Sequence, residues 1–404
     1  MTQASRNEPD CAREEKLPRR DWVLLPLICV LTILIFSGSV ELIARHEFVG
    51  SESALAKCFV LTDPTTGVRG VPNCVVREKT AEGPWVEERF NSQGYRAGME
   101  LGPKQPGTFR IVMVGSSTAM GEHVAREATI AARLPLELTR LTGHPVELYN
   151  EGLWIGFSHN TDLRFKDALA AHPDMVLWMI TQGDVFGGAA TVPTAAEIAQ
   201  MNQHGFVAKA MGRIKSTFAS KSLAEGISDI FGRTRTAVLL RVLLYQSQTQ
   251  YVKSFLAGGD DHQGYLKAEL SEAWKKRLRQ VDSDAADMEA KAKAAGVPLV
   301  AYYSPDRAQA AMISTNEWPQ GYDPYKLDRE LRAIVTSHGG TFLEILPDFR
   351  NIPNPEQYYY SVDGHPNASG HAEITHLLSN ALTHGAVPAL NVAGPQEPGL
   401  GGKE

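Results

Sequence analysis

The chain has 404 residues, of which 43% are hydrophobic and 21% charged, and its formal net charge is −6. This length allows one large domain or two small ones, and the composition is that of a globular protein. A negative charge argues against nucleic-acid binding, which needs a basic field. The cysteines form neither a C-x-x-C pair nor a Cys/His cluster with zinc spacing, so we expect no structural metal: Cys11, Cys29, Cys58 and Cys74. We also expect no cofactor.

A membrane-spanning helix at 22–45 is the first predicted element. The nineteen residues from Trp22 to Val40 carry no charge, which is close to the ~20 residues that cross a bilayer. Five basic residues precede this run, and only Arg45 and Lys57 follow it up to residue 60. The bias predicts a cytoplasmic segment at 1–21 and a single-pass anchor in the inner (cytoplasmic) membrane, with the rest of the chain periplasmic or otherwise extracytoplasmic. A cleaved signal peptide is the alternative.

Residues 46–108 form a lead-in segment with many turn signals and short strand-like runs. In an exported chain, Cys58 and Cys74 lie in an oxidising compartment and would close a loop that contains Gly and Pro turns. We expect a disulfide between them, and two free buried thiols are the alternative.

Alternating strand and helix signals fill residues 109–384. Short apolar runs at 109–115, 146–150, 175–181, 297–303 and 341–346 are typical of strands buried on both faces of a parallel sheet. Helical stretches are expected at 127–141, 159–171, 271–295, 324–338 and 368–383. The pattern predicts a doubly wound, flavodoxin-like α/β domain with a five-stranded parallel sheet, whose ligands bind beyond the carboxyl ends of the strands.

One connection is much longer than a crossover needs. The 115 residues between 181 and 297 predict a helical insertion at about 185–270, since a crossover takes about a dozen or more. Residues 205–253 carry eight Lys or Arg and two acidic residues, and 236–256 is an apolar, helix-like run. The Gly/Pro-rich end, 385–404, is expected to be a disordered tail.

Small hydroxyl residues follow the first strand, and an Asp-His pair comes late in the chain. Ser116 and Ser117 either cap a helix or place a nucleophile at the edge of the sheet. Asp363 can orient the His365 ring and stabilise its protonated form; alternatively, Asp363 caps the next helix and His365 lies on the surface. We expect His371 and His376, further along that helix, to be surface residues rather than metal ligands.

Taken together, these motifs resemble the SGNH/GDSL hydrolases over about residues 85–383. Gly115-Ser116-Ser117 with Gly121 is similar to the first block of that family, Asn150–Gly156 to the second and Asp363-Gly364-His365 to the last. The stretch "FNSQGYRAG" (90–98) looks like the lead-in of exported bacterial members. The resemblance implies Ser117 as nucleophile, His365 as base, Asp363 as its partner and the N–H groups of Ser117 and Gly156 as oxyanion donors.

The third block departs from the family pattern. It usually reads Gly-x-Asn-Asp, and here it is Thr181-Gln182-Gly183-Asp184, with a glycine in place of the asparagine that binds the oxyanion. Three interpretations stay open: Gln182 is a substitute donor, the site relies on the backbone N–H groups of Ser117 and Gly156, or its activity is low. Loss of one such donor costs ~100–1000-fold in rate.

The resemblance and the predicted location imply a membrane-anchored serine esterase or O-acyltransferase. Its substrate would be O-acyl esters, acetyl above all, of a polysaccharide. A lipid ester hydrolase is the first alternative, because the apolar run 236–256 could meet a bilayer. A degenerate member that binds glycan or scaffolds an envelope assembly is the second, favoured by the missing asparagine.

Overall fold

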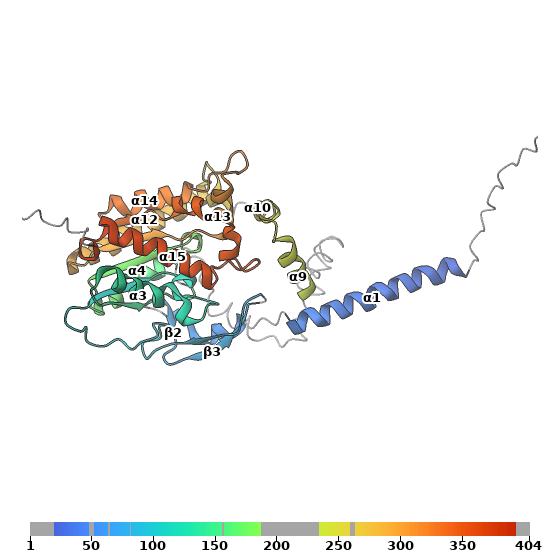
Figure 1. Cartoon of the computed structure of the whole chain (residues 1–404), viewed down its shortest axis with the longest axis horizontal. Helices are drawn as coiled ribbons and strands as arrows, with labels where there is room; N and C mark the ends of the chain where they lie inside the picture. Colours follow the sequence, from blue (N-terminus) through green and yellow to red (C-terminus); the bar gives the residue numbers. More distant parts are fainter. Residues whose placement is uncertain are drawn as a thin grey trace, which may run out of the picture.

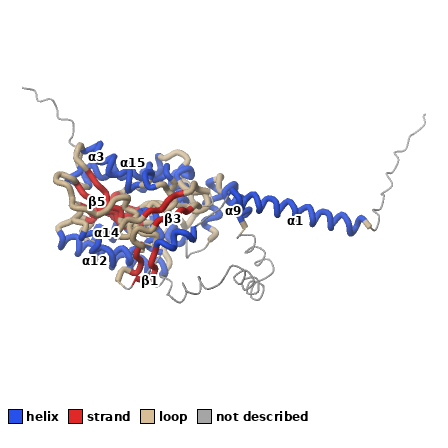
Figure 2. The backbone as a smooth tube through the Cα atoms, turned by 90° about the horizontal axis from the view of Figure 1, so that it is seen from below, coloured by secondary structure: helices blue, strands red, loops and turns tan. Residues whose placement is uncertain are grey.

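A five-stranded parallel sheet lies at the centre of the molecule (Figure 2). Its strands are β5 (Phe109–Val114), β6 (Val146–Asn150), β7 (Met175–Ile180), β8 (Leu299–Tyr303) and β9 (Thr341–Leu343), in the order β6-β5-β7-β8-β9. This is the order of flavodoxin-like folds, so the predicted fold class is confirmed. The computed structural model describes residues 20–47, 52–63, 65–80, 82–155, 157–186, 234–258 and 263–392.

Helices cover both faces of the sheet. On one face α3 (Ile130–Thr142) packs against α15 (Ala368–Ala381), and on the other α12 (Glu272–Ala295) packs against α4 (Ser158–Ala170) and α14 (Lys326–Ser337) (Figures 1 and 2). A further helix, α13 (Arg307–Thr315), follows β8. Because every residue of β7 and β8 is buried, the uninterrupted apolarity of these segments is explained by cover on both sides.

The strand register brings the carboxyl ends of the central strands together. Met113 of β5 lies opposite Asn150 of β6 and Leu177 of β7, and Ile180 of β7 lies opposite Tyr303 of β8. The residues that follow these strands therefore meet at one edge of the sheet.

The lead-in segment forms two small antiparallel pairs. After the 3-10 helix η1 (Glu52–Cys58), β1 (Phe59–Asp63) pairs with β2 (Gly67–Gly70), and β3 (Val75–Glu78) pairs with β4 (Val86–Arg89). The expected disulfide between Cys58 and Cys74 is present, with Cα atoms 5.5 Å apart. The alternative of two free thiols is thereby wrong.

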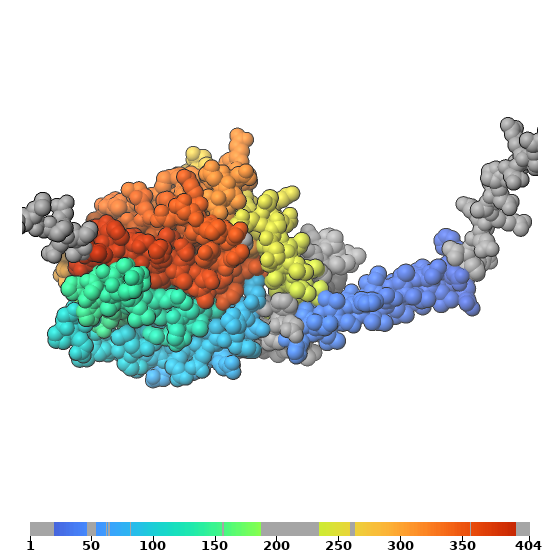
Figure 3. Space-filling view, viewed as in Figure 1, coloured from blue at the N-terminus to red at the C-terminus, as the bar shows by residue number. Residues whose placement is uncertain are grey.

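The first helix, α1 (Asp21–Glu47), is long and apolar enough to cross a membrane, with a mean hydropathy of 2.6. It projects from the α/β body (Figure 1). Between α1 and the body lie the helices of the insertion, drawn in yellow in Figure 3.

The insertion differs from the expectation of one helical run at 236–256. It forms α9 (Arg235–Leu244) and α10 (Gln248–Leu256). The break has a local cause, because the Ser247 side chain accepts the N–H of Gln250 and so starts a second helix. Most of the expected insertion, 187–233, lies outside the described residues.

The folded domain extends beyond residue 384, where the sequence predicted that it ends and a disordered tail begins. The segment that follows α15 still packs on the body, since Val387 and Leu390 are buried, and its polar groups are partnered, as when Gly385 N–H donates to Asn391. The folded unit thus reaches residue 392, and 393–404 lie outside the described residues.

Candidate active site

Ser117 stands in a sharp turn where β5 leaves the sheet. Gly115 precedes it with a φ of +148°, and a Cβ there would lie 2.6 Å from the Met179 carbonyl oxygen, so only glycine fits. A short helix, α2 (Ser117–Met120), begins at the serine and is capped by Gly121, which has a left-handed φ of +83°. Gly121 N–H donates to the Ser117 carbonyl. The turn therefore holds the Ser117 side chain at the edge of the sheet.

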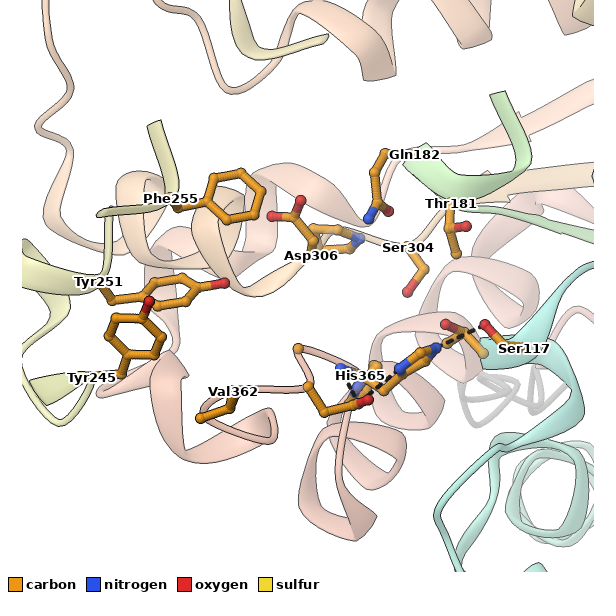
Figure 4. A pocket seen from close by; sticks show the side chains of 15 residues that line it. Ser117, Thr181, Gln182, Tyr245, Tyr251, Phe255, Ser304, Asp306, Val362 and His365 are labelled. Carbon is orange, nitrogen blue, oxygen red and sulfur yellow. Dashed lines mark hydrogen bonds and ion pairs between the residues drawn. The ribbon is translucent and has the colours of Figure 1, made fainter. Parts of the chain in front are cut away.

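His365 and Asp363 lie in the loop before α15 and complete a chain of contacts with Ser117. Figure 4 shows the His365 ring directed toward Ser117. The Ser117 hydroxyl lies 2.8 Å from His365 Nε2, and His365 Nδ1 lies 2.8 Å from Asp363 Oδ1. Since Nδ1–H donates to the carboxylate, Nε2 is free to accept the proton of the serine. The structure thus brings together the three residues that the sequence singles out as nucleophile, base and carboxylate.

One interpretation of the sequence was that Asp363 caps α15, and this is wrong. Asn367 caps this helix, because its side chain accepts the N–H groups of Ser369 and Gly370. The Asp363 carboxylate accepts instead from His365 backbone N–H at 3.0 Å, in addition to the ring.

The electrostatics of the pair fit a general base. Burial opposes ionisation of Asp363, yet the two neighbouring histidines hold the pKa of its carboxyl well below its usual value. Burial likewise opposes protonation of His365, but Asp363 and Glu122 raise the pKa of His365 above its usual value. The site therefore stabilises the imidazolium that forms when His365 takes the serine proton.

A second histidine lies behind the Asp363 carboxylate. His123 Nε2 is 3.5 Å from Asp363 Oδ2, and its Nδ1 is 3.1 Å from Glu78 Oε1. Burial opposes its protonation, but these carboxylates raise the pKa of His123 to about 11. The Tyr360 hydroxyl donates to the His123 carbonyl and so fixes the loop. His123 is thus a cation that positions Asp363, and no motif in the sequence indicated it.

Glu122 is a further ionisable group that lies against His365. Its carboxylate is 3.7 Å from His365 Nε2 and 3.4 Å from His123 Nε2. Burial raises the pKa of Glu122 to about 7, and the two histidines oppose the shift. The charge of this residue therefore changes in the pH range in which the base must work.

The lead-in segment supports both halves of the site. Arg96, from the "FNSQGYRAG" stretch, donates to the carbonyls of Gly121 and Val124, each at 2.7 Å, and forms a buried ion pair with Glu88. Glu82 accepts the backbone N–H of Asp363 at 2.9 Å. The lead-in therefore fixes the loop that follows the serine and the loop that holds the acid.

The two serines of the first block have different partners. Ser116 Oγ donates to Asp184 Oδ2 at 2.9 Å, and the same carboxylate accepts Thr181 N–H at 2.7 Å. Burial raises the pKa of Asp184 to about 6, against these hydrogen bonds. Ser116 is thus occupied with a structural contact to the third block, whereas Ser117 faces His365.

The second block ties its strand to the serine turn. Asn150 Nδ2 donates to the Ala119 carbonyl at 2.9 Å, and Asn150 Oδ1 accepts Gly152 N–H at 2.9 Å. Gly156, the expected oxyanion donor of this block, lies outside the described residues.

A pocket of about 260 Å³ opens in front of the triad; we call it the Ser117 pocket. Figure 4 shows Gln182 on the wall formed by Thr181, with its amide directed into the space, and the aromatic residues of the insertion across from Ser117. Arg307 holds this aromatic wall, with its guanidinium 3.9 Å from the Tyr251 ring centre and a hydrogen bond to the Tyr245 carbonyl. The lining consists of Ser117, Thr118, Thr181, Gln182, Tyr245, Tyr251, Phe255, Ser304, Pro305, Asp306, Val362, Asp363, Gly364, His365 and Pro366.

Part of this lining was not predicted from the sequence. Ser304 and Asp306 could have been found, because they directly follow a predicted strand. Asp306 has a structural role, since its side chain accepts Gln309 N–H and caps α13. Tyr245, Tyr251 and Phe255 carry no such signal, because their helices reach the pocket only through tertiary packing.

The two histidines on α15 differ. His376 is exposed as expected, but His371 is buried. His371 Nδ1 accepts the N–H of Ile130, at the start of α3, and burial lowers the pKa of His371 to about 3. The expectation of a surface residue was wrong because α15 packs on α3 along this face.

Two groups in the described part of the chain have ligand atoms close enough for a metal ion: Glu122 with His123 and His365, and His159 with Asp162 and Asp284. In the first group, His365 Nε2 is already in contact with Ser117. In the second, Lys291 Nζ lies 2.8 Å from Asp162 Oδ1. That the site works without a metal stays a prediction.

Comparison with known proteins gives distant structural similarities. No protein-family model and no curated protein matches the chain. Solved structures similar to it include TesA, with 11% identity and a TM-score of 0.36, over 68% of this chain and 97% of that one. The psychrotrophic esterase EstA from Pseudoalteromonas sp. has 9% identity and a TM-score of 0.35, over 68% and 96%. The lipase/acylhydrolase from Enterococcus faecalis has 10% identity and a TM-score of 0.32, over 68% and 95%. What the site can do therefore follows from the contacts of Ser117, His365 and Asp363.

Proposed function

We propose that the chain is a serine hydrolase of the SGNH/GDSL type that cleaves or transfers ester-linked acyl groups. The hydrogen-bonded chain from Ser117 through His365 to Asp363 carries the proposal. Ser117 Oγ attacks the ester carbonyl while His365 Nε2 takes its proton, and the imidazolium returns that proton to the leaving alcohol. Water, or the hydroxyl of a second molecule, then attacks the acyl-serine, with His365 again as base.

The negative charge on the carbonyl oxygen needs donors in front of Ser117. We assign this role to the N–H groups of Ser117 and Gly156 and to the Gln182 amide. The position of Gln182 on the wall of the Ser117 pocket supports its part. Gly183 has room for a side chain, since an added Cβ would meet only Thr181 Oγ1, at 3.4 Å.

The site works outside the cytoplasm in this proposal, on a single-pass anchor in the inner membrane. The apolar length of α1 and the basic residues that precede it support this orientation. The disulfide between Cys58 and Cys74 supports an oxidising compartment.

The substrate class that we propose is a polysaccharide with short O-acyl groups, above all acetyl. A pocket of about 260 Å³ suits a short acyl chain. Its aromatic wall of Tyr245, Tyr251 and Phe255, opposite polar groups such as Gln182, suits a ligand with both apolar and hydroxyl-bearing faces. The complete set of triad contacts favours an enzyme over a degenerate binding protein.

Ester hydrolysis by the full-length protein, in detergent, tests the proposal. The rate on 4-nitrophenyl acetate should exceed the rate on the palmitate ester, acetate should be released from an O-acetylated polysaccharide, and Ser117→Ala should abolish both activities. A preference for the palmitate ester would favour the lipid ester hydrolase. Binding of the polysaccharide without turnover of any ester would favour the binding protein.

A further inference from the structure

An apolar face on α9 is exposed next to the end of α1. Leu240, Leu243 and Leu244 are 42%, 60% and 55% exposed, and their i, i+3, i+4 spacing places them on one side of the helix. A large apolar face in water is unfavourable, so such a face in a soluble region needs a partner.

Hydrogen bonds fasten this helix to the last turns of α1. The Glu41 carboxylate of α1 accepts the N–H groups of Arg235 and Thr236, at 3.2 Å and 2.9 Å, and the Thr236 hydroxyl at 2.9 Å. A carboxylate at the start of a helix is favourable because it meets free N–H groups and the positive end of the dipole. The start of α9 is therefore fixed at the level of Glu41.

Each of the two helices contributes a small buried residue to the contact between them. Ala44 of α1 and Ala237 of α9 are buried, and the helices touch along this stretch. Ala237 shares its side of α9 with Leu240 and Leu244. The apolar side of α9 is thus continuous with the surface of α1, and Figure 1 shows α9 running across the end of α1 rather than along it.

We propose that α9 lies in the headgroup layer of the membrane that α1 spans, with Leu240, Leu243 and Leu244 inserted among the acyl chains. Arg241, exposed on the same helix, suits the phosphate groups at that depth. The inference rests on the proposed anchoring by α1, because the level of Glu41 sets the depth of α9.

The consequence for the enzyme is the position of its pocket. Tyr245 directly follows α9 and, with Tyr251 and Phe255 of α10, forms one wall of the Ser117 pocket. Figure 3 shows α9 and α10, in yellow, between α1 and the body. The mouth of the Ser117 pocket is thereby held at the bilayer surface. There it meets O-acylated polysaccharide chains that emerge from the membrane or lie along it.

Quenching of a fluorophore by lipid-borne doxyl groups tests the depth of α9. The full-length protein is placed at one copy per nanodisc, with anionic and zwitterionic phospholipids. Cys11 is replaced by serine, and the native Cys29 of α1, which is exposed, is labelled as the reference for lipid contact. In a second background that also lacks Cys29, the label is placed by Leu243→Cys or, as a repeat, Leu240→Cys. Leu136→Cys on α3, where the leucine is 72% exposed, is the matched control.

Labels at 240 and 243 should be quenched by shallow doxyl lipids a few-fold more than the label at 136, on the order expected for an interfacial helix. Quenching at Cys29 without quenching at 243 would overturn the inference alone, and a protein partner would then be the better occupant of the face. No quenching at Cys29 would overturn the anchor and the inference together. Turnover of a soluble ester by each labelled protein shows that it is folded and keeps these outcomes separate from the proposed catalysis.

Discussion

Two Ser–His–Asp groups in the described part of the chain differ in the order of their contacts, and the order in the first suits catalysis. In the first, His365 stands between Ser117 and Asp363. In the second, between α4 and α12, Asp284 stands in the middle: its carboxylate accepts Ser158 Oγ at 2.8 Å and lies 3.3 Å from His159 Nδ1. A serine that donates to a carboxylate has a much weaker base than imidazole as its partner. The order of contacts, rather than the residue types, decides what a group can do.

The surroundings of the two groups also suit different roles, catalysis for the first and structural support for the second. The first lies at the carboxyl edge of the sheet and lines the Ser117 pocket. The second joins two helices, and Gln280 donates to the same Asp284 carboxylate at 2.9 Å. We therefore expect changes in the first group to affect turnover and changes in the second to affect stability.

Removal of the two serines should separate the groups most clearly. Ser117→Ala should lower kcat by about 10⁴–10⁶-fold, because it removes the nucleophile. Ser158→Ala should leave kcat near the parental value and lower the free energy of unfolding by about 1–3 kcal/mol, because it breaks a buried hydrogen bond to a carboxylate. Ester hydrolysis and urea unfolding of both variants measure the two effects. A comparable loss of turnover in Ser158→Ala would contradict the comparison.

Substitution of the two aspartates, Asp363 and Asp284, sharpens the comparison between the two groups. Asp363→Asn should lower kcat by about 10³–10⁴-fold, because an amide neither fixes the His365 tautomer nor stabilises the imidazolium. Asp284→Asn should reduce the melting temperature with little effect on kcat. Steady-state kinetics and thermal unfolding distinguish the pair, and equal kinetic effects would show that the geometry does not separate their roles.

Substitutions in the third sequence block, at Gln182 and Gly183, should change turnover less than loss of a triad residue does. Gln182→Ala should lower kcat by roughly 10–1000-fold with little change in KM, because the oxyanion charge develops only in the transition state. Gly183→Asn should be neutral or mildly activating, since the position has room for a side chain. If Gln182→Ala turns over at the parental rate, the site uses backbone donors only.

The smallest expected effect is a shift of the pH profile. His365 must be neutral to act as base, so activity rises with pH as the ring, whose pKa is raised, loses its proton. The groups that face the ring are Asp363, Glu122 and His123. Glu122→Gln removes the negative charge that Glu122 carries above its own pKa of about 7. The substitution therefore lowers the pKa of His365 and moves the acidic limb of kcat/KM to lower pH. The control is Glu127→Gln, at an exposed residue five positions further along the chain, which should leave the acidic limb in place. Equal pH profiles for the parent and Glu122→Gln would refute the coupling.

The sequence allowed the fold to be predicted for a physical reason, and the resemblance to the SGNH/GDSL hydrolases implied the triad. Apolar runs such as 175–181 require burial on both faces, which implies a doubly wound sheet, and such a sheet gathers the residues at its strand ends. Ser117 could therefore be placed at the edge of the sheet, whereas its pairing with Asp363 and His365 was implied by the resemblance. The catalytic roles of these residues stay predictions, as does that of Gly156.

Features that depend on tertiary packing were not accessible in this way. Nothing local indicates that His123 meets Asp363, or that Tyr251 reaches the pocket from α10. The burial of His371 follows from its contact with α3, and the break before α10 from a single serine cap. Each of these depends on which surfaces meet, and periodicity does not encode that.

The measurement that tests the central claim most directly is the site of covalent labelling by a fluorophosphonate ester probe. The full-length protein is labelled, digested and mapped by mass spectrometry, alongside Ser117→Ala and Ser158→Ala. We predict one adduct, on Ser117, in the parent and in Ser158→Ala, and none in Ser117→Ala. The reason is that Ser117 Oγ lies 2.8 Å from the His365 imidazole, whereas Ser158 Oγ donates to the Asp284 carboxylate. An adduct on Ser116 or Ser158, or undiminished labelling of Ser117→Ala, would contradict the account.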